Sequence, residues 1–302
     1  MTLRGLIAAV HTPFDASGEL ALDVVEQQMG VLLRQRVPGV FVCGSTGESH
    51  SLSLEERLRL VERWLQVSRG TDLQVIVHVG SNSLRDARHL AAHAEKSGAV
   101  AISAQAPSYF RPRNAADVCE WCSEIAAAAP ATPFYFYDIP VMTGVNVSMP
   151  DLLDLVASRI PNFAGLKFTN TDLMSYQLCT RAHGGRFDIA FGVDEMLLAA
   201  LCFGARGAVG SSYNFAAPIY HRIIAAFERG DLAEAREEQF RSVQLIRILA
   251  AAGYMAAARE VMGWLGAPVG PPRLPNARLD AAGRERLKNQ LDACGFEAWI
   301  RE

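Results

Sequence analysis

The stretch PFYFYDIPVMTGVNVSMPDLLDLVASRIPNFAGLKFT, residues 133–169, contains the repeating unit that sets the fold of this chain. Its two ends, 133–139 and 163–169, are short apolar runs of the kind found in strands buried on both faces. Between them, residues 149–160 show a helical pattern, with a proline near the first turn, where its missing N–H costs nothing. This order of strand, helix and strand predicts two parallel strands with the helix packed on the sheet.

Similar apolar runs recur along the chain, at 5–10, 39–44, 74–80, 99–105, 187–192 and 207–212. Helical patterns lie between them, and one opens with a capping box formed by Ser53 and Glu56. Eight such units predict an α/β fold, a (β/α)8 TIM barrel that spans residues 1–229. An open doubly wound sheet would normally show a G-x-G-x-x-G after its first strand, and this chain has none there.

The strand pattern ends near Asp231. Three helical segments follow, at 231–253, 254–266 and 277–295, and the proline-rich loop 267–275 separates the last two. We therefore expect a C-terminal extension of three helices over residues 230–302.

Composition limits the classes of function. The 302 residues are half hydrophobic and one-fifth charged, an ordinary globular composition. The net charge of −3 favours neither a nucleic acid nor an anionic membrane as partner, and no apolar run has the length of about 18 residues that a spanning helix needs. The first residues lack the apolar core and cleavage site of a signal peptide, so we expect a cytoplasmic protein.

Two short motifs have spacings used by redox or metal sites. The cysteines of CEWC (119–122) lie inside a helical stretch instead of opening a helix after a strand, so we interpret them as buried helix residues. The two histidines of HLAAH (89–93) lack the glutamate of H-E-x-x-H and fall opposite the apolar stripe, so we expect a solvated face and no metal site. Cys43 and Cys202 stand in apolar runs and are expected in the core.

Lys167 lies inside the apolar strand 163–169, at the end where barrel enzymes place their active sites. Burial disfavours the charged ammonium and lowers its pKa, and a neutral amine can attack a ketone to form a Schiff base. The alternative is a structural lysine that is paired with an acid or extends its amine to solvent.

Other polar residues follow the predicted strand ends. Tyr137 could shuttle a proton near Lys167, although it could equally be a core aromatic like Tyr135 on the same strand face. The segment GSTGE (44–48) could bind an anion through its backbone N–H groups ahead of a helix, or be an ordinary strand–helix turn. Asp194 and Glu195 could bind substrate hydroxyls, and Asp194 could instead cap the following helix.

Taken together, these segments resemble the dihydrodipicolinate synthase/N-acetylneuraminate lyase family of pyruvate-dependent class I aldolases. The resemblance runs from GLIAAVHTPF (5–14) to GPPRLP (270–275) and includes FYFYDIPVMTGV, GLKFTNTDL, FGVDEMLL and GAVGSSYN in order. It implies that Lys167 forms the Schiff base and that Tyr137 is the acid/base residue. Ser45 and Thr46 would hold the substrate carboxylate. The implied contacts to a sugar chain are Thr169, Gly192, Asp194, Glu195 and Ser211.

The resemblance is greatest to the lyase branch, which implies reversible cleavage of N-acetylneuraminate to N-acetylmannosamine and pyruvate. It also implies a homotetramer, a small-molecule keto acid or sugar substrate and no metal or organic cofactor, because the covalent Schiff base on Lys167 supplies the electron sink. In the synthase branch an arginine follows the Y-x-x-P turn, and Met142 stands here instead. The alternatives are an aldolase for another 2-keto-3-deoxy acid, a synthase-like enzyme, a non-catalytic barrel that binds a sugar acid, and a metal-dependent aldolase.

Four positions depart from the lyase pattern. Ser49 and His50 replace a small and an apolar residue, Asp138 follows Tyr137 where asparagine or histidine is usual, and Ser108 stands where an aromatic is common. These changes leave the Schiff-base chemistry intact and bear on the choice of sugar and of its N-acyl group.

Overall fold

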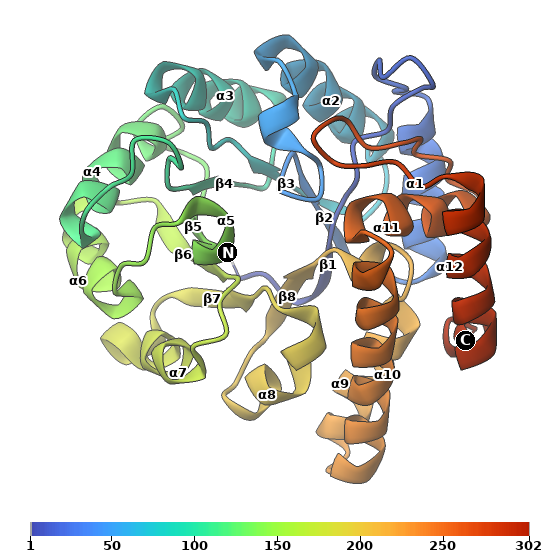
Figure 1. The fold of residues 1–302 in the computed structure, drawn as a ribbon. Helices are drawn as coiled ribbons and strands as arrows, with labels where there is room; N and C mark the ends of the chain where they lie inside the picture. The colour runs from blue at the N-terminus through green and yellow to red at the C-terminus, as the bar shows by residue number, and fades with distance from the viewer. Residues whose placement is uncertain (1, 302) are drawn as a thin grey trace.

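A computed structural model describes residues 2–301 and contains a closed barrel of parallel strands surrounded by helices (Figure 1). The strands pair in chain order, and β1 pairs with β8 to close the ring. They are β1 Gly5–Ala9, β2 Gly39–Val42, β3 Gln74–His78, β4 Ala101–Gln105, β5 Phe134–Asp138, β6 Phe163–Phe168, β7 Asp188–Phe191 and β8 Gly207–Gly210. The (β/α)8 TIM barrel predicted from the sequence is confirmed.

The barrel helices alternate with the strands around the outside of the ring (Figure 1). They are α1 Val24–Arg34, α2 Leu54–Val67, α3 Leu84–Ser97, α4 Ala115–Ala126, α6 Met149–Arg159, α7 Leu173–Arg181, α8 Leu197–Cys202 and α9 Ala217–Glu228. A short helix that the sequence did not indicate, α5 Pro140–Thr143, follows β5. The predicted capping box of Ser53 and Glu56 opens α2.

Three helices follow the barrel, as predicted, with one further turn at the end. They are α10 Leu232–Ala251, α11 Tyr254–Trp264, α12 Ala281–Cys294 and the single turn α13 Phe296–Trp299. The third starts four residues later than expected because Asp280 caps it, accepting a hydrogen bond from the Gly283 N–H. The division of the chain into two units at residue 230 stays a prediction.

The strands bury side chains on both faces. One face packs against the helices, and the other fills the barrel interior with a separate cluster that includes Ile7, Phe41, Ile76, Tyr135 and Val209. This double burial explains why the strand sequences are almost continuously apolar. Strand alternation then fixes which side chains reach the barrel mouth.

Two expectations about single residues have different outcomes. Cys43 is buried, but Cys202 is exposed, because it is the last residue of α8 and faces outward, so its assignment to the core was wrong. The CEWC cysteines, Cys119 and Cys122, are buried in α4 as expected. Within residues 2–301, no helix has the length and apolar character needed to span a membrane.

Candidate active site

Lys167 points into the barrel from β6, one strand away from Tyr137, with which it is in register. The side chain is only 3% exposed, so it does not extend its amine to bulk solvent. Its Nζ lies 4.0 Å from the ring centroids of both Phe41 and Tyr137. Burial lowers the pKa of Lys167 to about 7, and the negative charge of Asp194 opposes part of that shift. The amine is therefore partly neutral near pH 7 and can act as a nucleophile.

Tyr137 lies next to the amine, with its hydroxyl oxygen 3.4 Å from Ser45 Oγ. Its ring packs edge-on against Phe41 and His78. Burial raises the pKa of Tyr137 to about 12, so the free protein holds it as a phenol at neutral pH. Tyr135 is two residues earlier and donates to Asp188 at 2.9 Å, away from the lysine. Of the two tyrosines on this strand face, only Tyr137 lines the cavity that contains Lys167.

The GSTGE segment turns back tightly after β2. The N–H groups of Glu48 and Ser49 donate to the carbonyls of Ser45 and Gly44, and Glu48 adopts a left-handed backbone with φ 53°. Within residues 2–301, the N–H groups of Ser45 and Thr46 have no protein acceptor. The turn is followed by the single 3-10 turn Ser49–Ser51, and α2 begins only at Leu54. Any anion would therefore be held by the turn itself and not by the start of a helix.

Asp194 lies in a 3-10 turn after β7 and is buried. Its carboxylate accepts hydrogen bonds from the backbone N–H and the hydroxyl of Ser212, and burial raises its pKa to about 6. It does not cap α8, because Gln239 of α10 accepts from the Leu198 N–H at 2.8 Å instead. The helix-capping alternative for Asp194 was therefore wrong.

Two further contacts complete this side of the site. Ser211 shares a 2.7 Å hydrogen bond with the hydroxyl of Tyr254 from α11. The hydroxyl of Thr169 is buried beside that of Tyr137, and a Cβ added at Gly192 would lie 2.0 Å from it. A larger side chain at position 192 would collide with Thr169, so this position needs glycine.

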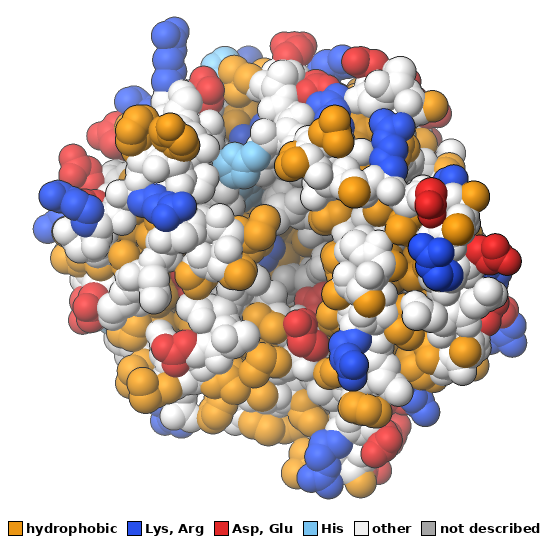
Figure 2. All heavy atoms as spheres, in the orientation of Figure 1, with side chains coloured by type: hydrophobic (Ala, Val, Ile, Leu, Met, Phe, Trp, Pro, Cys, Tyr) orange, Lys and Arg blue, Asp and Glu red, His pale blue; other side chains and the backbone are white. Residues whose placement is uncertain are grey.

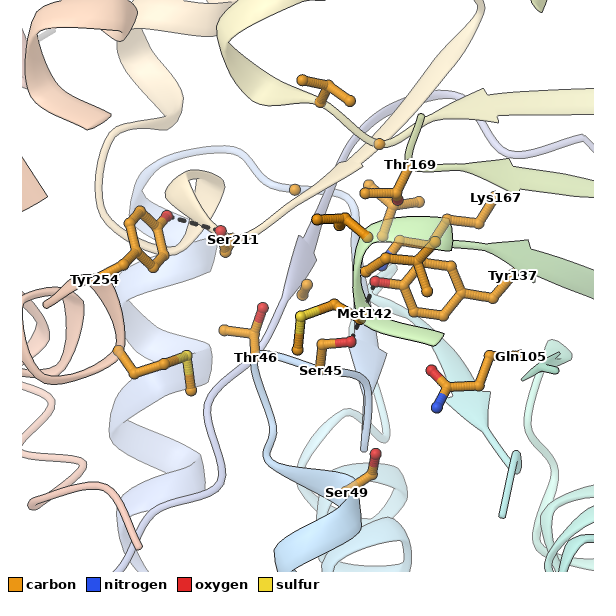
Figure 3. A pocket seen from close by; sticks show the side chains of 18 of the residues that line it. Ser45, Thr46, Ser49, Gln105, Tyr137, Met142, Lys167, Thr169, Ser211 and Tyr254 are labelled. Atoms are coloured by element: carbon orange, nitrogen blue, oxygen red, sulfur yellow. Dashed lines mark hydrogen bonds between the residues drawn. The ribbon is translucent and has the colours of Figure 1, made fainter. Parts of the chain in front are cut away.

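A cavity of about 830 Å³ at the barrel mouth brings together all nine residues predicted to be catalytic or to bind substrate, and Figure 2 shows it as a hollow in this face. These residues are Ser45, Thr46, Tyr137, Lys167, Thr169, Gly192, Asp194, Glu195 and Ser211. Figure 3 labels six of them, Ser45, Thr46, Tyr137, Lys167, Thr169 and Ser211. The sequence did not indicate Gln105, Tyr254 or Asn276, which also line it. Gln105 ends a strand and could have been found by the same rule, whereas the other two come from the C-terminal extension.

The spacing motifs do not form a metal site. His93 bonds to Glu62 at 2.9 Å on the surface, and His89 is exposed. In the part of the chain that is described, no group of three or more His, Cys, Asp or Glu side chains is placed to hold a metal ion. The chemistry available in the cavity is thus that of a buried amine, a phenol and hydroxyl and carboxylate groups.

Comparison with known proteins agrees with this geometry. The family model described as the dihydrodipicolinate synthetase family matches residues 2–294. The N-acetylneuraminate lyase of Mus musculus is 42% identical over 97% of this chain and 93% of its own length. The structure of the Proteus mirabilis N-acetylneuraminate lyase aligns with a TM-score of 0.95 at 38% identity, covering 98% of this chain and all of that one. That of the Aliivibrio salmonicida enzyme, named a sialic acid aldolase, aligns with a TM-score of 0.95 at 41% identity, covering 98% of both chains. The family model matches almost the whole chain, and a buried lysine and tyrosine lie at the mouth of its parallel barrel. This chain therefore belongs to the dihydrodipicolinate synthetase family.

Proposed function

We propose that this protein is a class I aldolase that reversibly cleaves N-acetylneuraminate to N-acetylmannosamine and pyruvate. The observation that supports it most strongly is the buried, partly neutral amine of Lys167 beside the phenol of Tyr137 in a polar-walled cavity. The lyases at about 40% identity over nearly the whole chain direct the choice of substrate. Within the family, Met142 in place of an arginine disfavours the synthase reaction.

In the proposed cleavage, the Lys167 amine attacks the C2 ketone of the open-chain keto acid, and loss of water leaves a protonated imine. Removal of the C4 hydroxyl proton breaks the C3–C4 bond. The bonding electrons move into the imine to give an enamine, and C4 becomes the aldehyde of N-acetylmannosamine. The enamine takes a proton at C3, and water then hydrolyses the imine to release pyruvate and the free amine.

Tyr137 would move the C4 proton. In the synthetic direction its phenol donates to the aldehyde oxygen as the C3–C4 bond forms, which suits a group held protonated. In cleavage it acts as the base. The positive charge of the nearby iminium favours the phenolate in that complex, because an opposite charge stabilises the ionised form.

The two ends of the substrate have complementary partners in the cavity. The unpaired N–H groups and the hydroxyls of Ser45 and Thr46 would hold the carboxylate. The polyol chain would extend along the opposite wall. Its proposed contacts are Thr169, Gly192, Asp194, Glu195 and Ser211.

No metal or organic cofactor is part of the proposal, because the protein amine provides the electron sink. On the resemblance we also propose a homotetramer and a cytoplasmic location. Tyr109 and Phe110 stack edge-on on the surface at 79% and 85% exposure, and such an aromatic pair supports a contact between subunits.

The test is a panel of keto acids monitored for pyruvate release. We expect release from N-acetylneuraminate, none in Lys167→Ala, and a kcat about 10²–10⁴-fold lower in Tyr137→Phe. Borohydride with pyruvate should fix an adduct on the parent protein and on Tyr137→Phe but not on Lys167→Ala. Release from a simpler 2-keto-3-deoxy acid, with none from N-acetylneuraminate, would make the substrate assignment wrong. Absence of any adduct would reject the class I mechanism, and loss of activity with EDTA would favour a metal-dependent aldolase.

A further inference from the structure

The cavity has a second polar wall, on the side away from Asp194 and Ser211. Gln105 ends β4, and His50 lies in the 3-10 turn that follows the GSTGE segment. Because the strand order is β4, β5, β6, β7, β8, Gln105 stands on one side of Tyr137 while the residues after β7 and β8 stand on the other. Figure 3 shows the same division, with Gln105 and Ser49 on one side of the Ser45–Tyr137 hydrogen bond.

His50 and Gln105 are hydrogen-bonded to each other, through His50 Nε2 and Gln105 Nε2. This bond can form in two ways: the amide nitrogen donates to an unprotonated Nε2, or, with the amide turned over, its oxygen accepts from a protonated Nε2. Gln105 is 5% exposed and in register with Tyr137, which fixes its side chain at the barrel mouth. His50 is exposed at the rim of the cavity, and partial burial of its ring together with the charge of Arg57 lowers the pKa of His50 below its ordinary value, so the ring is neutral at pH 7.

This pair therefore presents neutral hydrogen-bonding groups to the cavity. In either arrangement the atom of the Gln105 amide that does not face the ring and Nδ1 of His50 are left over, one as a hydrogen-bond acceptor and the other as a donor. A neutral acceptor and donor side by side match a secondary amide, which offers one N–H and one carbonyl. They match a carboxylate poorly, because one of the two groups is an acceptor and would repel it.

We propose that His50 and Gln105 bind the N-acyl substituent on C5 of the substrate and make this enzyme selective for N-acylated keto acids. The inference rests on the proposed function, which places C2 on Lys167, the C4 hydroxyl at Tyr137 and the polyol chain along the wall of Asp194 and Ser211. C5 lies between C4 and that chain, and its substituent branches away from the chain direction. The wall across Tyr137 from the chain is the one formed by Gln105 and His50.

The test compares two substrates that differ only at C5, N-acetylneuraminate and its analogue with a hydroxyl in place of the N-acetyl group. We expect the ratio of their kcat/KM values to fall about five- to tenfold in His50→Leu and in Gln105→Leu, the loss of about one hydrogen bond. Borohydride trapping of pyruvate should stay within twofold of the parent, because pyruvate lacks C5. The matched control is His93→Leu, which removes a histidine of α3 that bonds Glu62 of α2, and it should leave the ratio unchanged.

Three results separate the possibilities. An unchanged ratio in both variants, with parent-like melting temperatures, would overturn the assignment of this wall. A parallel fall in pyruvate trapping would also overturn it, because the pair would then act on the reacting end. Failure of the parent protein to release pyruvate from N-acetylneuraminate would instead reject the proposed function. Since His50 lies on a surface turn, its variant keeps the test available if Gln105→Leu does not fold.

Discussion

Lys167 owes its reactivity to the side chains that surround its amine. Two aromatic rings lie 4.0 Å from Nζ, and burial removes the water that would otherwise solvate an ammonium ion. Aromatic faces attract a cation and Asp194 does so as well, but burial is the largest effect on the pKa of Lys167. The result is a pKa of about 7 for an amine whose ordinary value is 10.5.

The pKa of Lys167 predicts how Schiff-base formation depends on pH. Only the neutral amine attacks a ketone, so the initial rate of borohydride trapping with pyruvate should rise with pH, with its midpoint near 7. Well below that midpoint the rate should fall about tenfold for each pH unit. Asp194→Asn removes a charge that favours the ammonium, so it should shift the midpoint to lower pH. A rate that is flat between pH 5 and 8 would contradict a neutralised lysine.

The same burial predicts that Lys167 reduces the stability of the fold. The pKa of Lys167 is about 7 in the folded protein, and its ordinary value is 10.5. Between pH 7 and pH 10.5 the unfolded chain therefore binds more protons than the folded protein, so the contribution of Lys167 to the unfolding free energy increases with pH. Keeping this amine buried at pH 7 costs on the order of 3–5 kcal/mol. Lys167→Met fills similar space without a charge and should raise the unfolding free energy by about 2–4 kcal/mol while abolishing activity. Chemical denaturation at pH 7 and pH 9 measures this, and the gain should be smaller at pH 9.

At the scale of the elements, the strand ends decide which residues meet. The last residues of every strand in a parallel barrel lie at the same rim. The strand pattern alone could therefore predict that Tyr137 and Lys167 lie close together. Apolar runs and caps such as Ser53 likewise predict elements, because both are local in the sequence. The strands in the structure begin or end within one or two residues of the predicted limits, because the last hydrogen bond of each strand depends on the neighbouring strand.

Contacts between distant segments could not be predicted in this way. The sequence could not show that Ser212 donates a hydrogen bond to the Asp194 carboxylate, that Gln239 caps α8, or that Cys202 at the end of α8 is exposed. Each depends on how one element packs on another far along the chain. The pairing of His50 with Gln105 was missed for the same reason, because 55 residues separate them.

The end of β7 offers a test of how closely these elements fit. A Cβ at Gly192 would lie 2.0 Å from the Thr169 hydroxyl, so Gly192→Ala should displace Thr169 from its place at the end of β6. We expect kcat/KM for N-acetylneuraminate to fall at least tenfold and the unfolding free energy to fall by about 1–3 kcal/mol.

Gly263→Ala is the matched control for this prediction. Gly263 lies within α11 with no atom within 4 Å of an added Cβ, so alanine should stabilise that helix by up to about 1 kcal/mol and preserve activity. Parent-like kinetics of Gly192→Ala would show that the strand end yields to the extra methyl group.

For the whole molecule, the C-terminal extension completes the site that the barrel begins. Tyr254 of α11 bonds Ser211 in the cavity, and Arg259 of the same helix forms an ion pair with Glu48 of the GSTGE turn. Both partners of that pair are nearly fully buried. Arg273, in the loop after α11, donates its backbone N–H to the second oxygen of Glu48 at 3.0 Å. The turn proposed to hold the substrate carboxylate is therefore fixed from the extension.

The buried pair predicts that stability and carboxylate binding change together. Glu48→Gln leaves the Arg259 guanidinium buried without its counter-charge, which should cost about 3–5 kcal/mol of unfolding free energy and raise the KM for pyruvate in the synthetic reaction. Adding Arg259→Met removes the uncompensated charge, so the double variant should regain part of the stability while the KM stays raised, because the turn is still unanchored. The exposed pair of Lys288 and Asp292 is the control, and Asp292→Asn should change stability by less than about 1 kcal/mol. If the double variant recovered both stability and the parent KM, the extension would support the barrel without shaping the turn. If stability returned while the KM stayed high, the extension would position the turn in addition to stabilising the fold.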